Sequence, residues 1–270
     1  MKIKNLGYRT DCIIREYGGV IEEKPAYFVI RMPSNPTFYA GNILLFKSSP
    51  SLGDYSKWMN AHEREFGPAS GHVGFGWDTE DVGETKVFAE NGFSIDVESV
   101  LQLRNLKSTK EPSIDAEMRR IVSDADWSAV TELQILVSEH EVPSGDFRDF
   151  KNSLFKTYRK IGENGHGDWW GAFSGNTLIC DMGLYFDKNS KVGRFQAVET
   201  HPNYRRKGVC SSLLHKVVKH AIDSVGAKDL VICTENNSEA SRIYEALGFE
   251  HREFQYGASL HCPYKNRFNK

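Results

Sequence analysis

The sequence has little of several features that mark other classes of protein. Only 5 of its 270 residues are cysteine, and no two of them form a Cys-x-x-Cys pair. Apolar stretches such as residues 43–46 are short, and none approaches the ~20 residues that span a bilayer. The basic start at residues 2–4 is not followed by the apolar segment of a secretory signal. We therefore expect a soluble, cytoplasmic protein with reduced thiols and no membrane partner.

An excess of charge of one sign is also missing. Lys and Arg total 34 against 36 Asp and Glu, which gives a formal net charge of −2. Such a chain lacks the broad positive field that binds phosphate backbones, so we expect no nucleic-acid partner. The 9 histidines show no zinc-ligand spacing with the cysteines, and we expect no metal.

A polar, proline-interrupted stretch at residues 105–113 is typical of a linker. We predict a smaller domain at 1–108 and a second domain at 116–270, both of the α/β class. In the second domain, hydrophobic periodicity and turn residues separate short strands from amphipathic helices. The predicted strands are 119–122, 169–173, 178–186, 192–200 and 230–233, and the predicted helices are 123–139, 149–161, 209–225 and 240–247.

The first segment contains a faint copy of the second. Residues 86–93 align with residues 242–249, and both stretches end in Gly-Phe. A strand-like run at 37–46, a helix candidate at 55–66 and a strand at 72–77 precede the first of them, in the order found in the second half. We interpret the first segment as a half-sized copy that has lost its chemistry, because Phe88 lacks the hydroxyl of Tyr244.

A basic loop leads into the helix predicted at 209–225. Arg205, Arg206 and Lys207 precede Gly208, and Cys210 follows within the first helical turn. Free N–H groups and the positive dipole end of a helix bind phosphate, and small residues let a diphosphate approach the backbone. A solvated turn would look similar, and a cysteine at this position could instead be a reactive thiol. We interpret Cys210 simply as a small residue.

A second motif follows at the next strand-to-helix junction. It consists of Asn237, Ala240, Tyr244, Gly248 and Phe249. Together with Arg205-x-x-Gly208-x-Cys210, it resembles the GNAT superfamily of acyl-CoA-dependent N-acetyltransferases over about residues 118–260. Two departures are Cys210, where the family usually has glycine or alanine, and Thr200, where valine is more usual.

The resemblance implies a mixed, mostly antiparallel, splayed sheet flanked by helices, with a smaller α/β half-domain in front. Acetyl-CoA would lie in the splay as the co-substrate, without a metal. Tyr244 would protonate the departing thiolate, and an N–H near Val198 would stabilise the oxyanion. Asn237 would support the cofactor and could also cap its helix. The implied cofactor-binding residues are Val198, Glu199, Thr200, Arg205, Arg206, Lys207, Gly208, Val209, Cys210, Asn237 and Tyr244.

The general base is harder to assign from the sequence. Strand alternation puts Arg194, Gln196, Val198 and Thr200 on one face and Glu199 on the other. Relatives with a base on this strand carry it at the positions of Arg194 and Gln196, which are not basic at neutral pH. Glu199 could serve if a β-bulge turns it, and a chain of water molecules is an equal alternative. Arg194 and Gln196 are predicted to bind the acceptor, with Arg194 holding a carboxylate.

The predicted function is direct acetyl transfer from acetyl-CoA to a primary amine of a small molecule, such as an amino acid or related metabolite. Glu199 and Tyr244 are the predicted catalytic residues of an enzyme that is a monomer or homodimer. Two alternatives remain open. One is a non-catalytic acyl-CoA-binding regulatory module, and the other is an acetyltransferase that acts on a protein amine.

Overall fold

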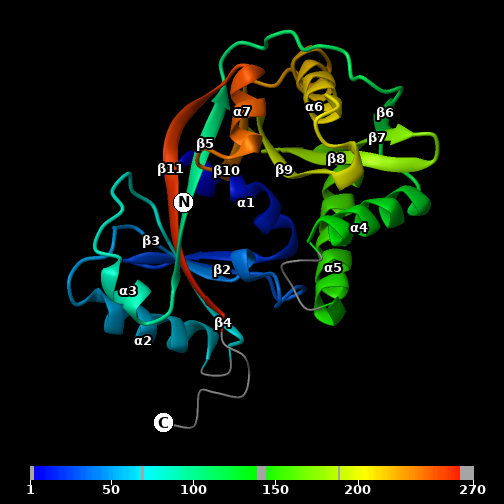
Figure 1. Ribbon diagram of the computed structural model, residues 1–270. Helices are drawn as coiled ribbons and strands as arrows, with labels where there is room; N and C mark the ends of the chain where they lie inside the picture. The colour runs from blue at the N-terminus through cyan, green and yellow to red at the C-terminus, as the bar shows by residue number, and fades with distance from the viewer. Residues whose placement is uncertain (1–2, 68–69, 139–143, 188, 262–270) are drawn as a thin grey trace. The chain divides into compact units, whose positions relative to one another are not determined.

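The computed structural model describes residues 3–67, 70–138, 144–187 and 189–261. The chain forms two compact units (Figure 1). Unit 1 contains residues 1–100 and 253–270, and unit 2 contains residues 101–252. These limits differ from the expected ranges of 1–108 and 116–270, because the C-terminal strand returns to the first unit instead of staying with the second. Within the described residues, every helix is too short or too polar to pass through a lipid bilayer.

Unit 1 is a twisted sheet covered by helices. Its strands lie in the order β1-β2-β3-β4-β11-β5, and β3 and β4 are parallel whereas β1/β2, β2/β3 and β4/β11 are antiparallel. Its core is rich in aromatic rings, with Trp58 stacked on Phe46 at 3.8 Å between centroids. The elements are α1 (Leu6–Gly18), β1 (Val20–Glu23), β2 (Tyr27–Arg31), β3 (Ile43–Phe46), α2 (Asp54–Phe66), β4 (His72–Trp77), α3 (Lys86–Glu90) and β5 (Ser94–Leu103).

Unit 2 carries the other elements. Its strands lie in the order β10-β9-β8-β7-β6, with β9 and β10 parallel and the remaining pairs antiparallel. The elements are β6 (Glu117–Arg120), α4 (Asp124–Ser138), α5 (Ser144–Glu163), β7 (Gly167–Ser174), β8 (Thr177–Phe186), β9 (Val192–Thr200), α6 (Val209–His220), β10 (Asp229–Glu235), α7 (Glu239–Ala246) and β11 (Phe249–His261). The last of these crosses into unit 1 after residue 252.

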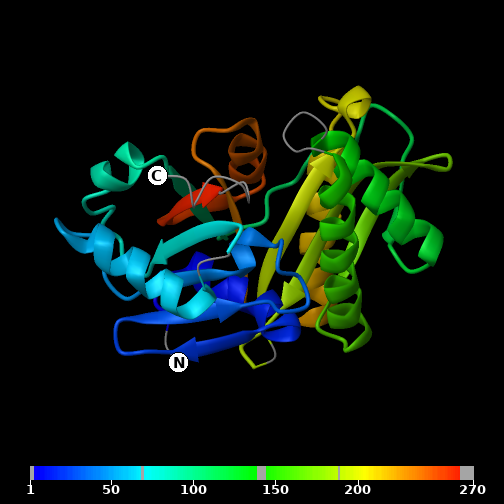
Figure 2. The same cartoon turned by 90° about the horizontal axis from the view of Figure 1, so that it is seen from below.

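Helices cover both faces of the sheet in unit 2. In Figure 1, α6 lies above β7, β8 and β9, whereas α4 and α5 lie below them. Figure 2, seen from below, shows α4 and α5 in front of these strands. Side chains of β8 therefore alternate between two environments. Cys180, Met182 and Leu184 belong to the apolar cluster beneath α6, and Asp181 lies on the α4 side, where it bonds Gln134.

Helix α4 begins at a reciprocal cap. Ser123 Oγ accepts from Asp126 N, and Asp126 Oδ2 accepts from Ser123 N, each at 3.1 Å. Arg119 donates from both terminal nitrogens to the Asp126 carboxylate at 3.0 and 2.8 Å. This pairing holds the pKa of Asp126 far below its usual range. Arg119 and the backbone N–H groups donate to the ionised carboxylate and so stabilise the charged form. Ser123 and Asp126 therefore form a capping box at the start of the helix predicted at 123–139.

The strand and helix predictions for the second domain are confirmed with shifts at the ends. The prediction for β9 matches its bounds, and the helix predicted at 209–225 is α6 continued by a π-helical turn at Ala221–Val225. In the first segment, the strand predicted at 37–46 is wrong before residue 43. Asn42 there bonds Met32 N and the carbonyls of Asn35 and Phe38 through its side chain, and this bonding holds a 3₁₀ turn at Tyr39–Gly41. Helix α1 and strands β1 and β2 gave no signal that we recognised.

The internal copy appears in the order of elements. Unit 1 contains β3-α2-β4-α3-β5, and β9-α6-β10-α7-β11 repeats this order. Both α2 and α6 begin after a left-handed glycine, Gly53 at φ 86° and Gly208 at φ 80°. At the start of α2, however, the Asp54 carboxylate accepts from Ser51 N at 2.9 Å. The loop before α2 is thus held by a carboxylate of the chain itself, and it carries no counterpart of the basic residues 205–207.

We predict that Asp126→Ala lowers the free energy of unfolding by ~2 kcal/mol, because it removes a helix cap and leaves Arg119 without its partner. The native pKa of Asp126 is depressed, so its contribution is present above the unfolded value of ~3.9 and is lost as the pH falls further. Urea unfolding of both proteins between pH 7 and pH 3 measures the difference.

Asp124→Ala is the matched control for this experiment. Asp124 lies on the same helix, but its side chain is 88% exposed in its ion pair with Arg159. Its removal should cost less than ~1 kcal/mol. Equal losses from the two substitutions would contradict the role given to the cap.

Candidate active site

Strands β9 and β10 pair only at their beginnings. Within the described residues, the parallel ladder joins Val192, Gly193 and Arg194 to residues 229–231. Beyond Arg194 the two strands continue to Thr200 and Glu235 without a ladder between them. This is the splay expected from the sequence, and it leaves backbone groups of β9 available to a ligand.

A cavity of about 410 Å³ lies beside the splayed end of β9. Helix α6 points its first turn at this cavity, and no side chain in the described part of the chain caps it. The N–H groups of that turn are therefore available to an anion. The lining residues come from β9, the loop after it, α6 and α7: Val198, Glu199, Thr200, Tyr204, Arg205, Arg206, Gly208, Val209, Cys210, Ser211, Glu239, Ala240, Ile243 and Tyr244.

Most of the predicted cofactor-binding residues line this cavity, but Lys207 and Asn237 do not. The Lys207 ammonium lies over the Tyr204 ring, 4.8 Å from its centroid. Asn237 is exposed and has φ 59°, two residues before α7 begins at Glu239. The expected capping role of Asn237 is wrong, because Ser238 Oγ accepts from Ser241 N at 3.1 Å and so caps that helix. Whether Lys207 and Asn237 meet a bound cofactor stays a prediction.

Tyr244 lies at the inner wall of the cavity. It is 4% exposed and packs in the apolar cluster beneath α6. Burial raises the pKa of its phenol well above the ordinary value, and the nearby Cys210, Cys180 and Glu199 add to the shift. The phenol is therefore neutral at physiological pH and carries a proton that it can donate.

A β-bulge interrupts β9 at the point where the predicted catalytic residues lie. Gln196 pairs with Gly183 and Glu199 pairs with Asp181, so β9 has one residue more than β8 across this interval. Ala197 takes up the extra residue with φ 43°, which is uncommon for a residue with a side chain. After the bulge, Val198 packs beneath α6. The bulge that Glu199 would need in order to turn is thus present.

Gln134 of α4 holds this bulge from below. Its Nε2 donates to the carbonyl oxygen of Ala197 at 3.1 Å and to Asp181 Oδ1 at 3.2 Å. Its Oε1 accepts from Lys151 Nζ at 2.9 Å, and Trp169 Nε1 donates to Asp181 Oδ2 at 3.0 Å. Gln134 is 1% exposed; its bond to Asp181 and the bond from Trp169 are buried, and those to Ala197 and Lys151 are partly buried. An unpaired partner in such a place is costly.

The ionisable groups in this network shift one another's pKa values. Burial raises the pKa of Asp181 well above its usual range, against the donors from Trp169 and Gln134. Burial also lowers the pKa of Lys151, although the negative charges of Glu199 and Asp181 oppose that shift. Glu199 thus lies close enough to influence Asp181 and Lys151 on one side and Tyr244 on the other. Glu199 therefore lies between the cavity and the polar network of Gln134, Lys151 and Asp181.

The two residues predicted to bind the acceptor lie outside the cavity, on the face of β9 that α5 covers. Gln196 Oε1 accepts from Tyr158 OH of α5 at 3.4 Å. Arg194 is 6% exposed, and its Nε donates to the carbonyl oxygen of Phe195 at 3.2 Å. Because the bulge shifts the alternation by one residue, Arg194, Gln196 and Glu199 share this face. Their role toward an acceptor stays a prediction.

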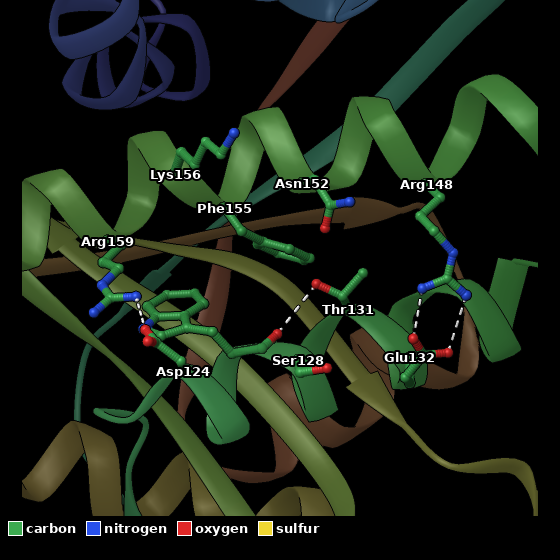
Figure 3. Close-up of a pocket in the computed structure, with 10 residues that line it drawn as sticks. Asp124, Ser128, Thr131, Glu132, Arg148, Asn152, Phe155, Lys156 and Arg159 are labelled. Carbon is green, nitrogen blue, oxygen red and sulfur yellow. Dashed lines mark hydrogen bonds and ion pairs between the residues drawn. The ribbon is translucent and has the colours of Figure 1, made fainter.

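A second cavity of about 430 Å³ lies between α4 and α5 (Figure 3). The two cavities have similar volumes, so the charges of their lining residues must show which one suits a phosphate-bearing ligand. Arg148 pairs with Glu132 and Arg159 pairs with Asp124, and in Figure 3 the Lys156 amine points away from the other side chains. The cations here are mostly neutralised by the chain itself. The cavity at α6 is therefore the better site for a phosphate-bearing ligand.

Sequence analysis missed the polar network beneath the bulge. Gln134, Lys151 and Asp181 lie on three different elements, and no local motif joins them. Asp181 did carry a signal, since it is a carboxylate inside the apolar run at residues 178–186. A charged residue in a strand that is buried on both faces indicates either a paired partner or a functional site.

Comparison with known families identifies unit 2. Residues 127–249 match the model of the acetyltransferase (GNAT) family. This segment contains the splayed strands, the start of α6 and the helix that carries Tyr244. The second unit therefore carries a domain of the GNAT family, as the motifs indicated. Comparison with curated protein sequences gives no match.

Solved structures of low sequence identity share the fold over the whole chain. A conserved protein of unknown function from Staphylococcus epidermidis has a TM-score of 0.72 at 14% identity, with 92% of this chain and 96% of that chain covered. A GCN5-related N-acetyltransferase from Kribbella flavida has a TM-score of 0.67 at 12% identity, with 96% of each chain covered. A tandem GNAT protein from the clavulanic acid biosynthesis pathway has a TM-score of 0.54 at 11% identity, with 90% and 83% covered. The two-unit arrangement of a GNAT domain and a GNAT-like half therefore occurs in other proteins.

Proposed function

We propose that this protein transfers an acetyl group from acetyl-CoA directly to a primary amine of a small molecule. The observation that carries the proposal is the uncapped start of α6, which faces a cavity beside the splay of β9 and β10 and has Tyr244 at its inner wall. A diphosphate carrier with an extended arm matches this combination of an anion site and free strand backbone.

In this proposal the cofactor is held mainly by backbone groups. The N–H groups of Val209, Cys210 and Ser211 bind the pyrophosphate, and Arg205 and Arg206 add positive charge from the exposed loop. The pantetheine arm lies along residues 198–200 as an added strand. The left-handed conformation of Gly208 lets the loop turn directly into the helix.

The chemical step then uses groups on both sides of β9. Glu199 accepts a proton from the acceptor amine, and the neutral amine attacks the thioester carbonyl. The N–H of Val198 stabilises the oxyanion that forms. Tyr244 donates its proton as the thiolate leaves. Its raised pKa keeps the phenol protonated but also makes it a weaker acid, so the transfer depends on a thiolate that is itself desolvated and therefore more basic.

The acceptor is assigned to the face of β9 that carries Glu199, Gln196 and Arg194. The buried guanidinium of Arg194 favours an acceptor with a carboxylate, such as an amino acid or an acidic metabolite. Gln134 and Lys151 act as positioning residues in this scheme, because they fix the bulge that aligns Glu199 with Val198.

We predict that the protein binds acetyl-CoA and releases free CoA when a small primary amine is added. Calorimetry with acetyl-CoA and with CoA measures binding, and a thiol assay with panels of small amines and peptides measures turnover. Binding without turnover would favour a regulatory acyl-CoA module, and turnover with peptides alone would favour a protein substrate. Absence of heat and of any shift in melting temperature would overturn the proposal.

Tyr244→Phe should reduce kcat by ~10² to 10⁴ and leave the affinity for acetyl-CoA unchanged, because only the proton donor is lost. Steady-state kinetics and calorimetry measure the two quantities. Tyr55→Phe, a partly buried tyrosine of unit 1, is the control and should behave like the wild type. An unaltered kcat for Tyr244→Phe would exclude the phenol as the acid.

Glu199→Gln should also reduce kcat by ~10² to 10⁴, since the amine then has no protein base. The deficit should shrink as the pH rises toward the pKa of the amine itself, ~10 for a lysine-like amine, because the substrate then arrives deprotonated. Rates from pH 7 to pH 10 check this, with the exposed Glu245→Gln as the control. A deficit that stays constant with pH would point to a structural role.

A further inference from the structure

Two cysteines from different elements meet beneath the start of α6. Cys210 is in the first turn of α6 and lines the cavity, whereas Cys180 of β8 is fully buried. The strand register sets Cys180 opposite Thr200, whose Oγ1 donates to Cys180 Sγ at 3.4 Å. Cys210 packs against the apolar cluster that contains Cys180, and the two thiols lie close enough for a hydrogen-bonding interaction that shifts the pKa of each. Sequence position separates these residues by an entire strand and loop, so only the fold brings them together.

The two thiols have opposite character. The bond to Cys210, followed by burial, raises the pKa of Cys180, so this thiol keeps its proton and donates it to the hydrogen bond. The same bond lowers the pKa of Cys210 against the effect of burial. The positive end of α6 stabilises negative charge at the same sulfur. The pair therefore combines a cavity-wall thiol that loses its proton more easily with a protonated partner behind it.

Other cysteines in the described part of the chain lack this combination. Burial raises the pKa of Cys12 in unit 1 to about 12, which makes it a poor nucleophile. Cys233 lies half-buried on β10 and is not among the residues that line the cavity. Cys210 is half-buried at the cavity wall and has a second cysteine close by, and an accessible thiol of lowered pKa beside a resolving cysteine is the arrangement found in redox-reactive sites.

We propose that Cys210 and Cys180 form a redox modification site, which a peroxide converts into a disulfide that closes the cofactor cavity. The Cys210 thiolate attacks one oxygen of hydrogen peroxide, which gives a sulfenic acid and, after protonation, one water. The Cys180 thiol then attacks that sulfur, its proton leaves with the hydroxyl as a second water, and the S–S bond forms. Two thiols are oxidised by two electrons, and one peroxide is reduced to two waters.

The effect on the cavity rests on the proposed function. A disulfide ties the first turn of α6 to β8, whereas pyrophosphate binding needs the N–H groups of that turn to point at the ligand. The oxidised protein should bind acetyl-CoA about tenfold more weakly. Bound acetyl-CoA covers Cys210 in turn, and should slow its oxidation.

The test begins with the reduced wild-type protein, so it does not depend on the folding of a variant. Hydrogen peroxide treatment, alkylation and peptide mass mapping should reveal one disulfide between the Cys180 and Cys210 peptides, reversible by dithiothreitol. Cys210→Ala should abolish the linked peptide, Cys180→Ser should stop the reaction at oxidised Cys210, and Cys233→Ser should match the wild type. Peroxide treatment that leaves both thiols free, or joins Cys210 elsewhere, would overturn the inference.

Calorimetry with acetyl-CoA separates this inference from the proposed function. A disulfide that forms and weakens binding supports both. Equal binding by the reduced and oxidised proteins overturns the closure of the cavity. If the reduced protein does not bind acetyl-CoA although the disulfide forms, the proposed function fails and the modification site stands.

Discussion

One hydrogen bond, from Gln134 Nε2 to the carbonyl oxygen of Ala197, governs how the rest of the site is arranged. It holds a bulge whose left-handed residue the strand would not otherwise favour. The bulge changes which way every later residue of β9 faces. Val198 and Thr200 therefore turn toward α6 and the cavity, and Glu199 turns toward Asp181. Without this extra residue, Val198 and Thr200 would share the face of Arg194 and Gln196, and Glu199 would lie on the opposite face.

Burying the polar groups around Gln134 costs free energy, and the hydrogen bonds among them offset this cost. Asp181 is fully buried, and its donors come from Trp169 and Gln134 instead of from a cation. Lys151 donates to Gln134, so its charge reaches the carboxylates only at a distance. A tight ion pair would neutralise the acidic groups and fix them in place. The glutamine in the middle instead hydrogen-bonds Asp181 without a cation in direct contact, and the pKa of this buried carboxyl is raised.

Features that depend on neighbouring residues in the sequence could be predicted, and features that depend on contacts between distant residues could not. The helix that begins at residue 209 and the bounds of β9 are local patterns, and the fold confirms both. The bulge at Ala197 is not local, because it exists only through contact with a helix some sixty residues earlier in the chain, a separation given by Gln134 to Ala197. The Cys180–Cys210 contact is likewise created by strand pairing. Capping was one possible role for Asn237, but Ser238, the next residue, caps the helix, which shows how a one-residue uncertainty at a helix start changes an interpretation.

The return of β11 to unit 1 has a consequence for how the chain matures. Residues 253–261 supply the strand that pairs with β4, yet they are made after the whole of unit 2. During synthesis, β4 must therefore wait with an open edge while the later unit emerges from the ribosome. The first-made unit is thus completed only after unit 2 has been made, and a chain without residues 253–261 would leave the edge of β4 unpaired.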